Sequence, residues 1–270
     1  MNGTQYVAKA IDKHGFIAWN DEENHIWADL ITRQNRLVRD KACSEYLDGL
    51  TALNLPLHRV PQLFEVDAVL EQATGWRTTP VPCLIDFDTF FRLLANKQFP
   101  VATFLRTRAD FDYLEEPDIF HEIYGHCPLL THPAFAYFTE VYGKTGVQAS
   151  KEERVYLARL YWFTVEFGLV KQSQSIQTGS AEHISIYGGG ILSSPTETRF
   201  AFSSPHPQRS DFVVEDVLRT PYRIDVLQPI YYVIESLDAL FELSQRDLLL
   251  LVKDAQKKPL FAPLNNSVAV

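Results

Sequence analysis

The segment Glu116-Pro-Asp-Ile-Phe-His-Glu-Ile-Tyr-Gly-His126 decides the local fold, because helix-start signals lead directly into two histidines. Pro117 suits the first turn of a helix, where the backbone N–H has no partner in any case. The carboxylate of Asp118 suits the positive end of the same helix. The sequence therefore predicts a helix that begins near Pro117 and carries both imidazoles.

The spacing of the two histidines is unusual, since His121 and His126 are five residues apart. On an ideal α-helix five residues turn through about 140°, so the rings would lie on different faces. Gly125 can end the helix in a left-handed conformation, and Pro128 disfavours its continuation, so His126 is expected to swing back towards His121. The pair also fits two structural histidines near a helix end. The spacing is not that of His-Glu-x-x-His, which weakens a metallopeptidase interpretation.

A third candidate ligand lies in Tyr161-Trp-Phe-Thr-Val-Glu166-Phe-Gly-Leu169, an apolar helical run around one carboxylate. A buried carboxylate must meet a cation, a metal ion or hydrogen-bond donors, and a salt bridge to an arginine would satisfy Glu166 too. Two imidazoles and one carboxylate are also the ligand set of the facial triad that holds Fe(II), and the same set can hold catalytic zinc. Trp162 lies one helical turn before Glu166, which favours a pocket for a planar substrate.

Helix signals dominate the rest of the chain, so the predicted fold class is mainly α with a small β element. Ser150 and Glu153 form a capping box that opens a helix to about residue 168. Ser236 can cap a helix through Leu243, with more helix to about Lys253. Short β-like runs and three consecutive glycines predict a small sheet near a tight turn. The other expected helices cover residues 22–50, 61–72 and 88–96. The expected strands cover residues 80–83, 101–104 and 183–187. The glycines at 188–190 and the apolar pair at 191–192 are expected to belong to the same small sheet as 183–187.

The composition bounds the class of protein. Of 270 residues, 46% are hydrophobic and 22% charged, an ordinary globular mixture that excludes a disordered or fibrous chain. The formal net charge of -9 and the lack of a basic run argue against nucleic-acid binding. Three separated cysteines predict neither a disulfide framework nor a zinc ribbon. The sequence contains no secretory signal and no apolar run of membrane-spanning length, so a cytoplasmic protein without a membrane partner is expected.

Taken together, the motifs resemble those of the pterin-dependent aromatic amino acid hydroxylases, and most closely their bacterial phenylalanine-hydroxylating members. The resemblance covers about residues 27–253 of the single domain expected over residues 1–270. It implies one catalytic domain of this type with a short N-terminal extension and a C-terminal tail, no regulatory or tetramerisation domain, and hence a monomer or homodimer. The motifs that carry the resemblance are Pro117-Asp-Ile-Phe-His-Glu-Ile-Tyr-Gly-His-Cys-Pro-Leu129, Tyr161-Trp-Phe-Thr-Val-Glu-Phe-Gly-Leu169, Tyr187-Gly-Gly-Gly-Ile-Leu-Ser-Ser194 and Gln228-Pro-Ile-Tyr-Tyr-Val-Ile-Glu-Ser236.

The same resemblance implies an activity and its cofactors. It implies a mononuclear Fe(II) site held by His121, His126 and Glu166. It further implies a tetrahydropterin as reductant, O2 as oxidant and L-phenylalanine as the substrate, which is hydroxylated to L-tyrosine. Tryptophan hydroxylation by the same chemistry is the alternative within the family. A zinc-dependent hydrolase with Glu122 as general base is the alternative outside it.

Several substrate contacts are implied in the same way. Arg106 is implied to clamp the substrate carboxylate, a role that suits arginine's planar fork, and Asp118 to orient it. Ile224 stands where a tyrosine hydroxylase carries an acidic residue, so an apolar side chain there suits an unsubstituted ring. The remaining implied contacts are Pro117, Trp162, Phe167, Ser193, Ser194 and Tyr113. The resemblance places Tyr113 on a loop that is mobile in the family.

For the pterin, the resemblance implies that Phe90 stacks on the ring and that Glu122 contacts it through water. Tyr161 is a further implied cofactor contact, and Glu122 and Tyr161 are the implied catalytic side chains. Without the resemblance, core packing explains Phe90 equally well. The preceding loop, Cys83-Leu-Ile-Asp-Phe87, departs from the family pattern, so no pterin contacts are assigned to it.

Overall fold

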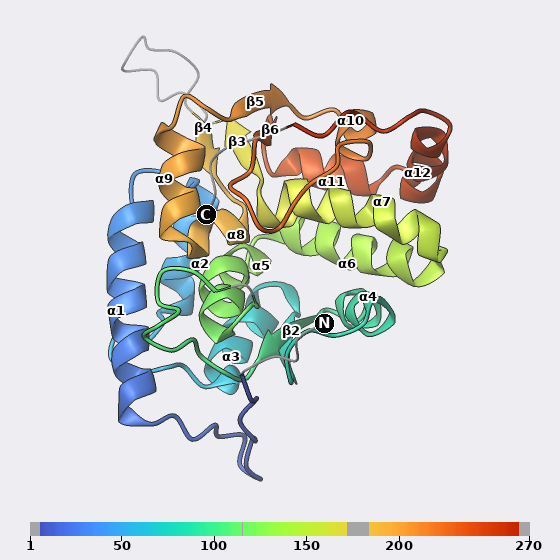
Figure 1. The fold of residues 1–270 in the computed structure, drawn as a ribbon. Helices are drawn as coiled ribbons and strands as arrows, with labels where there is room; N and C mark the ends of the chain where they lie inside the picture. Colours follow the sequence, from blue (N-terminus) through green and yellow to red (C-terminus); the bar gives the residue numbers. More distant parts are fainter. Residues whose placement is uncertain (1–5, 115, 172–183, 265–270) are drawn as a thin grey trace.

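The computed structural model describes residues 6–114, 116–171 and 184–264. Within these residues helices dominate and the strands form two small sheets, which confirms a mainly α fold with a minor β element (Figure 1). The helices are α1 (Asp21–Val38), α2 (Ser44–Leu53), α3 (Leu63–Thr74), α4 (Phe87–Ala95), the π-helix η1 (His121–His126), α5 (Cys127–Leu130), α6 (Pro133–Gln148), α7 (Lys151–Tyr161), the π-helix η2 (Trp162–Glu166), α8 (Gly189–Ser193), α9 (Pro195–Ser203), α10 (Val214–Val217), α11 (Asp238–Ser244) and α12 (Leu248–Gln256). The strands are β1 (Arg77–Val81), β2 (Gln98–Ala102), β3 (Leu169–Lys171), β4 (Ile184–Ile186), β5 (Gln208–Asp211) and β6 (Ile230–Ile234).

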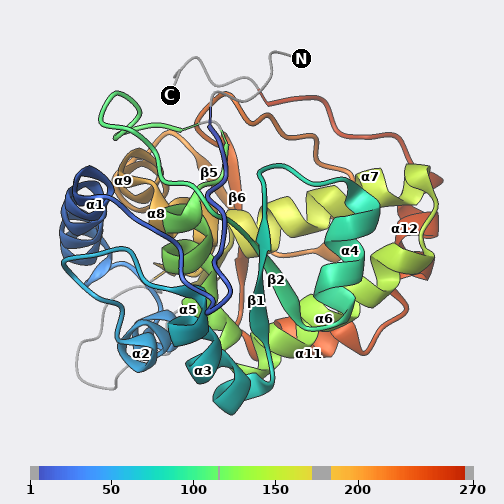
Figure 2. The same ribbon diagram turned by 90° about the horizontal axis from the view of Figure 1, so that it is seen from below.

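Two groups of helices flank the middle of the molecule. The helices α1, α8 and α9 lie together on one side, and α4, α6, α7 and α12 lie on the other, in both views (Figures 1 and 2). Helix α6 packs against α4 and α11, and α12 packs against α7. The strands β1 and β2 run side by side between the two groups (Figure 2). The short helix α8 contacts both π-helices, which carry the candidate metal ligands.

The two sheets differ in how they pair. The strands β1 and β2 form a parallel pair, and the other sheet has the order β4-β3-β6-β5. In it, β3 is antiparallel to β4 and parallel to β6, and β5 is parallel to β6. Every residue of β6 is buried, which explains its uninterrupted apolar sequence. The strands expected at 80–83, 101–104 and 183–187 are confirmed as β1, β2 and β4 with shifted ends, although residue 183 lies outside the described residues.

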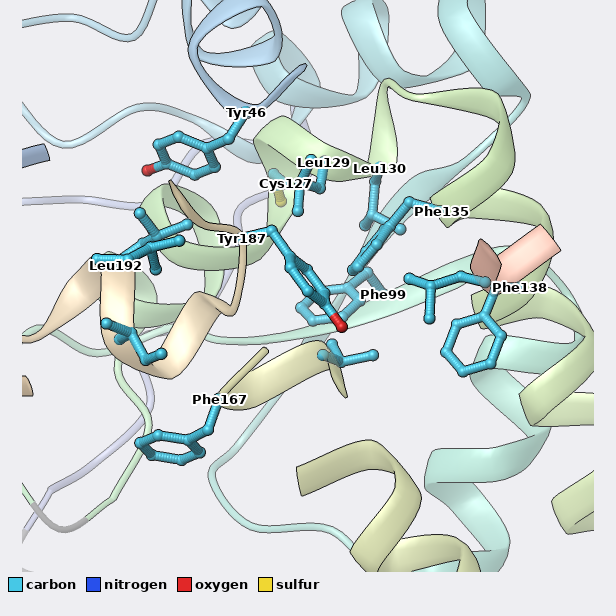
Figure 3. Close-up of a cluster of buried hydrophobic side chains, with 14 of the residues drawn as sticks. Tyr46, Phe99, Cys127, Leu129, Leu130, Phe135, Phe138, Phe167, Tyr187 and Leu192 are labelled. Carbon is cyan, nitrogen blue, oxygen red and sulfur yellow. The ribbon is translucent and has the colours of Figure 1, made fainter. Parts of the chain in front are cut away.

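Aromatic side chains fill the core beside the π-helices. Figure 3 shows Phe99 from β2, Phe135 and Phe138 from α6, and Tyr187 after β4 in one buried cluster. The rings of Phe135 and Tyr187 meet edge to face with centroids 6.5 Å apart. The centroid of the Phe99 ring is 5.2 Å from that of His126. The packed core therefore reaches one of the candidate ligands and supports its ring.

The single helix expected over residues 22–50 is wrong, because two helices, α1 and α2, cover this region. The chain leaves the helical path where its backbone pairs with the edge of β4. Ile186 N donates to Lys41 O at 2.8 Å, and Cys43 N donates to Ile186 O at 2.9 Å. Apolar periodicity cannot reveal this break, because the partner strand lies far along the chain.

The helix starts give a mixed result. The capping box is confirmed, since Ser150 Oγ accepts from Glu153 N at 3.2 Å and the Glu153 carboxylate accepts from Ser150 N at 2.8 Å. Ser236 is not a cap, because α11 begins at Asp238 without a side-chain cap. The helix expected up to about residue 168 is α7 followed directly by η2. The helices expected at 61–72 and 88–96 are confirmed as α3 and α4.

Two expectations about glycines are wrong. The residues 188–192 do not form a sheet at a tight turn, because α8 occupies most of this segment. Gly125 does not end its helix in a left-handed conformation, because the positive-φ glycines of the described residues are Gly15 and Gly75. The chain instead continues through η1 into α5. The turn of η1 is widened, and the i→i+5 pattern of a π-helix brings residues five apart towards the same side.

A buried tyrosine supports this widened turn from α2. The hydroxyl of Tyr46 donates to the backbone carbonyl of Tyr124, inside η1, at 2.7 Å. Tyr46 is 0% exposed, so no water can replace the bond. Irregular helical turns disturb the regular ladder of backbone hydrogen bonds, and a side-chain donor compensates for the loss.

Tyr46→Phe is expected to lower the free energy of unfolding by about 1–3 kcal/mol, because a buried carbonyl loses its donor. Urea unfolding measures the change. Tyr137→Phe is the matched control, since Tyr137 lies on α6 and is 40% exposed, and its effect should stay within about 0.5 kcal/mol. Equal stability of Tyr46→Phe and the wild type would contradict the support of η1 by this hydroxyl.

Candidate metal centre and substrate pocket

The structure brings the three candidate ligands to one point. The Nε2 atoms of His121 and His126 are 3.1 Å apart. Glu166 Oε1 is 3.4 Å from His126 Nε2, and Glu166 Oε2 is 3.7 Å from His121 Nε2. One donor atom of each residue lies within 4.8 Å of the others. The histidines come from η1 and the carboxylate from η2, so both ligand-bearing turns are π-helical.

A serine from α8 fixes the orientation of His121. His121 Nδ1 is 2.9 Å from Ser193 Oγ, and that hydroxyl donates to Gly189 O at 2.8 Å. Because the hydroxyl proton is used there, the serine oxygen accepts from His121 Nδ1–H, which leaves the lone pair on Nε2 for a metal ion. Burial lowers the pKa of His121 to about 4, so the ring is neutral at pH 7.

Glu166 remains ionised although it lies in this enclosed site. Burial raises its pKa, but His126, His121 and a hydrogen bond from the backbone of Gly190 together bring the pKa below the usual value. One carboxylate and two imidazoles are suitable ligands for a divalent iron or zinc ion. The charge and the convergence of these donor atoms therefore fit a mononuclear metal site.

Steric contact with the candidate ligands explains why glycines occupy the start of α8. A Cβ on Gly189 would lie 2.5 Å from ring atoms of His126, and a Cβ on Gly190 would lie 3.0 Å from Glu166 Oε2. A Cβ on Gly125 would lie 2.7 Å from Gly189 O. Residues without side chains are thus required for α8 to pack directly against the ligands, rather than for a tight turn.

Arg106 and Asp118 form a buried ion pair beside the ligands. Arg106 Nε and Nη2 donate to the two Asp118 oxygens at 2.8 and 2.9 Å. Burial raises the pKa of Asp118, but the guanidinium outweighs it and brings the pKa below its usual value. Asp118 Oδ1 also accepts from His121 N at 3.0 Å, so this carboxylate links the arginine to the ligand helix. Nη1 and the second N–H of Nη2 make no hydrogen bond to the described residues, so this edge of the guanidinium can take a second carboxylate.

Aromatic rings line another side of the site. The indole of Trp162 stacks on Tyr222 with centroids 4.4 Å apart and an interplanar angle of 16°. It also packs on Phe167 with centroids 4.5 Å apart at 33°. Trp162 Nε1 donates to Gln228 Oε1 at 2.9 Å. The sequence singled out Trp162 and Phe167 but missed Tyr222 and Gln228; only Gln228, which begins one of the four motifs, carried a signal.

A buried carboxylate lies behind this wall and was also missed. Glu197 accepts from Gln228 N at 3.2 Å and from the hydroxyl of Tyr231. Burial raises the pKa of Glu197 to about 7 in spite of these two hydrogen bonds. In the sequence Glu197 looks like an ordinary acidic residue in the first turn of a helix, so no local pattern marks it.

Two of the residues implied to contact a pterin, Phe90 and Tyr161, are in contact with each other. Phe90, on α4, meets Tyr161 edge to face with centroids 5.3 Å apart at 84°. Burial, and then the charges of Glu166 and Asp118, raise the pKa of Glu122 well above its usual value. This shift favours the protonated carboxyl, which can donate as well as accept a hydrogen bond. The roles of these residues towards a pterin remain predictions.

The other implied substrate contacts also remain predictions. The hydroxyl of Ser194 accepts from a backbone N–H in the first turn of α9 at 3.3 Å and so caps that helix. Pro117 is half-buried and precedes the ion-paired aspartate. Tyr113, on the segment before Pro117, is 46% exposed. Ile224 is 59% exposed and lies two residues after Tyr222, which stacks on the indole of Trp162.

Comparison with known protein families agrees with this site. The family model described as biopterin-dependent aromatic amino acid hydroxylase matches residues 4–251. The chain belongs to this family. The membership confirms the resemblance drawn from the motifs, and the fold is that of an aromatic amino acid hydroxylase catalytic domain.

Relatives of this biopterin-dependent hydroxylase are similar over almost their whole length. A phenylalanine-4-hydroxylase of Vibrio cholerae is 57% identical over 261 residues, which is 97% of this chain and 88% of the relative. The apo structure of the cold active phenylalanine hydroxylase from Colwellia psychrerythraea 34H has 53% identity and a TM-score of 0.91, covering 96% of this chain and 97% of that chain. A phenylalanine hydroxylase structure from Chromobacterium violaceum with bound oxidized Fe(III) has 39% identity and a TM-score of 0.84, covering 93% and 90%.

Within the described residues, none of the helices of this hydroxylase combines the length and the apolar character needed to cross a bilayer. Cys43, Cys83 and Cys127 form no disulfide among the described residues, as the sequence predicts.

Ser193→Ala is expected to weaken Fe(II) binding about 10–100-fold, because the acceptor that fixes the tautomer of His121 is lost. Anaerobic calorimetric titration with Fe(II) measures the affinity. Ser185→Ala is the matched control, since Ser185 is a buried serine on β4 with 3% exposure, and it should bind iron like the wild type. An unchanged affinity of Ser193→Ala would show that the hydroxyl does not orient the ring.

The pKa of Glu197 predicts a pH dependence of stability. Its value rises from 4.5 to about 7 on folding, so the folded protein holds a proton that the unfolded chain releases over this range. The associated stability is complete below pH 4.5 and is lost as the pH rises to about 7. Relative to Glu197→Gln, the wild type should lose up to about 3 kcal/mol of unfolding free energy across this range. Urea unfolding at both ends of the range measures it, and parallel pH profiles would contradict the shift.

Proposed function

We propose that this chain is a phenylalanine 4-monooxygenase, which hydroxylates L-phenylalanine to L-tyrosine with O2 and a tetrahydropterin at a mononuclear Fe(II) site. The observation that carries the proposal is the position of a partly free arginine beside the three candidate ligands. Asp118 connects the two, because it binds the side chain of Arg106 and the backbone of His121. The activity named for the relatives supports the same substrate.

Arg106 anchors the backbone of the amino acid in this proposal. Asp118 holds one edge of the guanidinium by two hydrogen bonds, which stops the side chain from rotating. The remaining edge offers two parallel N–H groups to a substrate carboxylate. A donor pair that is already fixed lowers the entropy cost of positioning the substrate.

The substrate ring lies against the aromatic wall. Trp162 and Phe167 present apolar faces next to Glu166, and Pro117 completes the lining. An arginine at one end and aromatic rings at the other match the two ends of phenylalanine, whose carboxylate is charged and whose side chain is apolar. Ser193, Ser194 and the Tyr113 segment are the further contacts that we assign to the substrate side.

The donor set of the site suits the proposed cofactors. Fe(II) and a tetrahydropterin, when bound, activate O2 for insertion into an aromatic ring, a chemistry that no side chain supplies. His121, His126 and Glu166 would hold the iron from one side and leave its other positions open. Phe90 would stack on the pterin, with Tyr161 and the carboxyl of Glu122 as its neighbouring hydrogen-bonding groups.

Tryptophan is the alternative substrate, because the same anchor and wall could take a larger ring. The apolar Ile224 favours a ring without a hydroxyl, and we retain phenylalanine as the substrate. A zinc-dependent hydrolase using the same ligands lacks support from the relatives, which are named as phenylalanine-4-hydroxylases. We further propose that the chain acts as a single catalytic domain, as a monomer or homodimer, on a small molecule rather than on nucleic acid.

Tyrosine formation from phenylalanine, Fe(II), O2 and a reduced pterin tests the proposed function. His121→Ala, His126→Ala and Glu166→Ala should each abolish the product, because a metal site with two protein ligands binds iron weakly. Arg106→Ala should lose stability, because Asp118 is left as a buried unpaired charge, but it should still bind iron, and its main effect on the reaction should be a raised KM for phenylalanine, because the carboxylate anchor is removed. Chromatographic measurement of tyrosine gives the result. Zinc-dependent hydrolysis without pterin-dependent oxidation, or a preference for tryptophan, would refute the assignment.

A further inference from the structure

We propose that Gln228 is a positioning residue, whose side-chain amide fixes the plane of the Trp162 indole and thereby the shape of the pocket for the substrate ring. The inference rests on the proposed function, because that function makes Trp162 a wall of the pocket. Gln228 takes part in no step of the reaction. It acts through the indole, with which its side chain shares one hydrogen bond.

The amide of Gln228 is satisfied in only one orientation. Its Oε1 accepts from Trp162 Nε1 at 2.9 Å, and its Nε2 donates to Arg223 O at 2.9 Å and to Val226 O at 3.0 Å. A flipped amide would set a donor against the indole N–H and an acceptor against two carbonyls, so all three bonds would be lost. Gln228 is 1% exposed, which leaves no water to replace them. The indole N–H therefore faces a fixed acceptor.

The ring contacts of Trp162 alone do not fix the orientation of its indole, and the hydrogen bond to Gln228 supplies the missing restraint. Tyr222 stacks on the indole at 4.4 Å, and Phe167 packs on it at 4.5 Å. Such contacts hold the separation of the ring planes, but they only weakly resist small changes of χ1 and χ2 that tilt or slide the indole, because dispersion attraction is nearly undirected. A hydrogen bond at the edge of the ring is directional. Together they fix both the position and the rotation of the indole.

Gln228 is itself anchored from behind. Its backbone N–H donates to Glu197 at 3.2 Å, and the hydroxyl of Tyr231 donates to the same carboxylate. Glu197 is 7% exposed and Tyr231 is 0% exposed. A buried network in which each member has its partner is rigid. Because Glu197 belongs to α9 and Tyr231 to β6, these two elements hold Gln228, and through it the indole, in a fixed place.

The bond controls a side chain rather than the ligand backbone. Trp162 begins η2 and Glu166 ends it, and the turn is held by its own bond from Phe167 N to Trp162 O at 2.8 Å. Loss of the Gln228 amide should therefore let the indole turn while the carboxylate of Glu166 stays in place. The effect should appear in substrate binding and not in iron binding.

Gln228→Met tests the proposal, because methionine has a similar length and no amide. At saturating Fe(II), O2 and tetrahydropterin, the KM for phenylalanine should rise about tenfold, the loss expected for one buried hydrogen bond. The KM for the pterin and the affinity for Fe(II) should not change. The fraction of oxidised pterin that yields tyrosine should fall, because a displaced ring is poorly aligned for reaction.

Gln62→Met is the matched control. Gln62 also bonds the backbone in both directions, accepting from Ile17 N at 2.8 Å and donating to Ile17 O at 3.1 Å, but it lies at the start of α3. The Gln62→Met variant should be less stable than the wild type, but its KM for phenylalanine and its yield of tyrosine per pterin should not change. An equal rise in KM in both variants would overturn the proposal.

A double-mutant cycle separates positioning from general destabilisation. In Trp162→Phe the ring has no N–H, so adding Gln228→Met should cost little further phenylalanine binding. Full additivity of the two changes overturns the proposal, as does a wild-type KM in Gln228→Met. If the methionine variant does not fold, Gln228→Asn withdraws the amide by one methylene and carries the same test. A wild type that forms no tyrosine overturns the proposed function together with this inference, whereas an active wild type with an unaffected Gln228→Met overturns the inference alone.

Discussion

The widened turn of η1 is the feature on which the rest of the site depends. In a regular α-helix the two imidazoles would stand about 140° apart, whereas the π-helical turn places their Nε2 atoms 3.1 Å from each other. Two contacts from outside sustain it: Tyr46 donates to a carbonyl within the turn, and Asp118 accepts from the N–H of His121. The second π-helix, η2, delivers the carboxylate of Glu166 to the same point.

The site also depends on how its buried charges are matched. Arg106 and Asp118 neutralise each other at close to zero exposure, and breaking such a pair by removing one partner is strongly unfavourable. Glu166 stays charged beside two imidazoles, while burial and the nearby carboxylates raise the pKa of Glu122. The site therefore holds one anionic ligand, two imidazoles and a guanidinium edge that faces away from Asp118. This combination holds a divalent ion and an amino acid side by side.

The sequence predicted what local pattern determines and missed what distant contacts determine. The capping box at Ser150 follows from residue type and spacing, and the structure confirms it. The grouping of His121, His126 and Glu166 was implied by the family resemblance, and the structure brings the three side chains together. The break between α1 and α2 does not, because it depends on pairing with β4. The π-turn could not be anticipated from Gly125, since the supporting tyrosine lies in another helix. Glu197 and Tyr222 were missed because they act through partners that only the fold brings near.

The close approach of α8 limits how this chain can diverge. Gly189 and Gly190 leave no room for even a methyl group beside His126 and Glu166, and the same short helix supplies the serine that bonds His121. A single turn of polypeptide thus touches all three donor side chains. A side chain at Gly189 would collide with the His126 ring, one at Gly190 would press on the Glu166 carboxylate, and a residue without a hydroxyl at Ser193 would leave His121 without its acceptor. Few substitutions in this short helix can therefore leave the candidate ligands undisturbed.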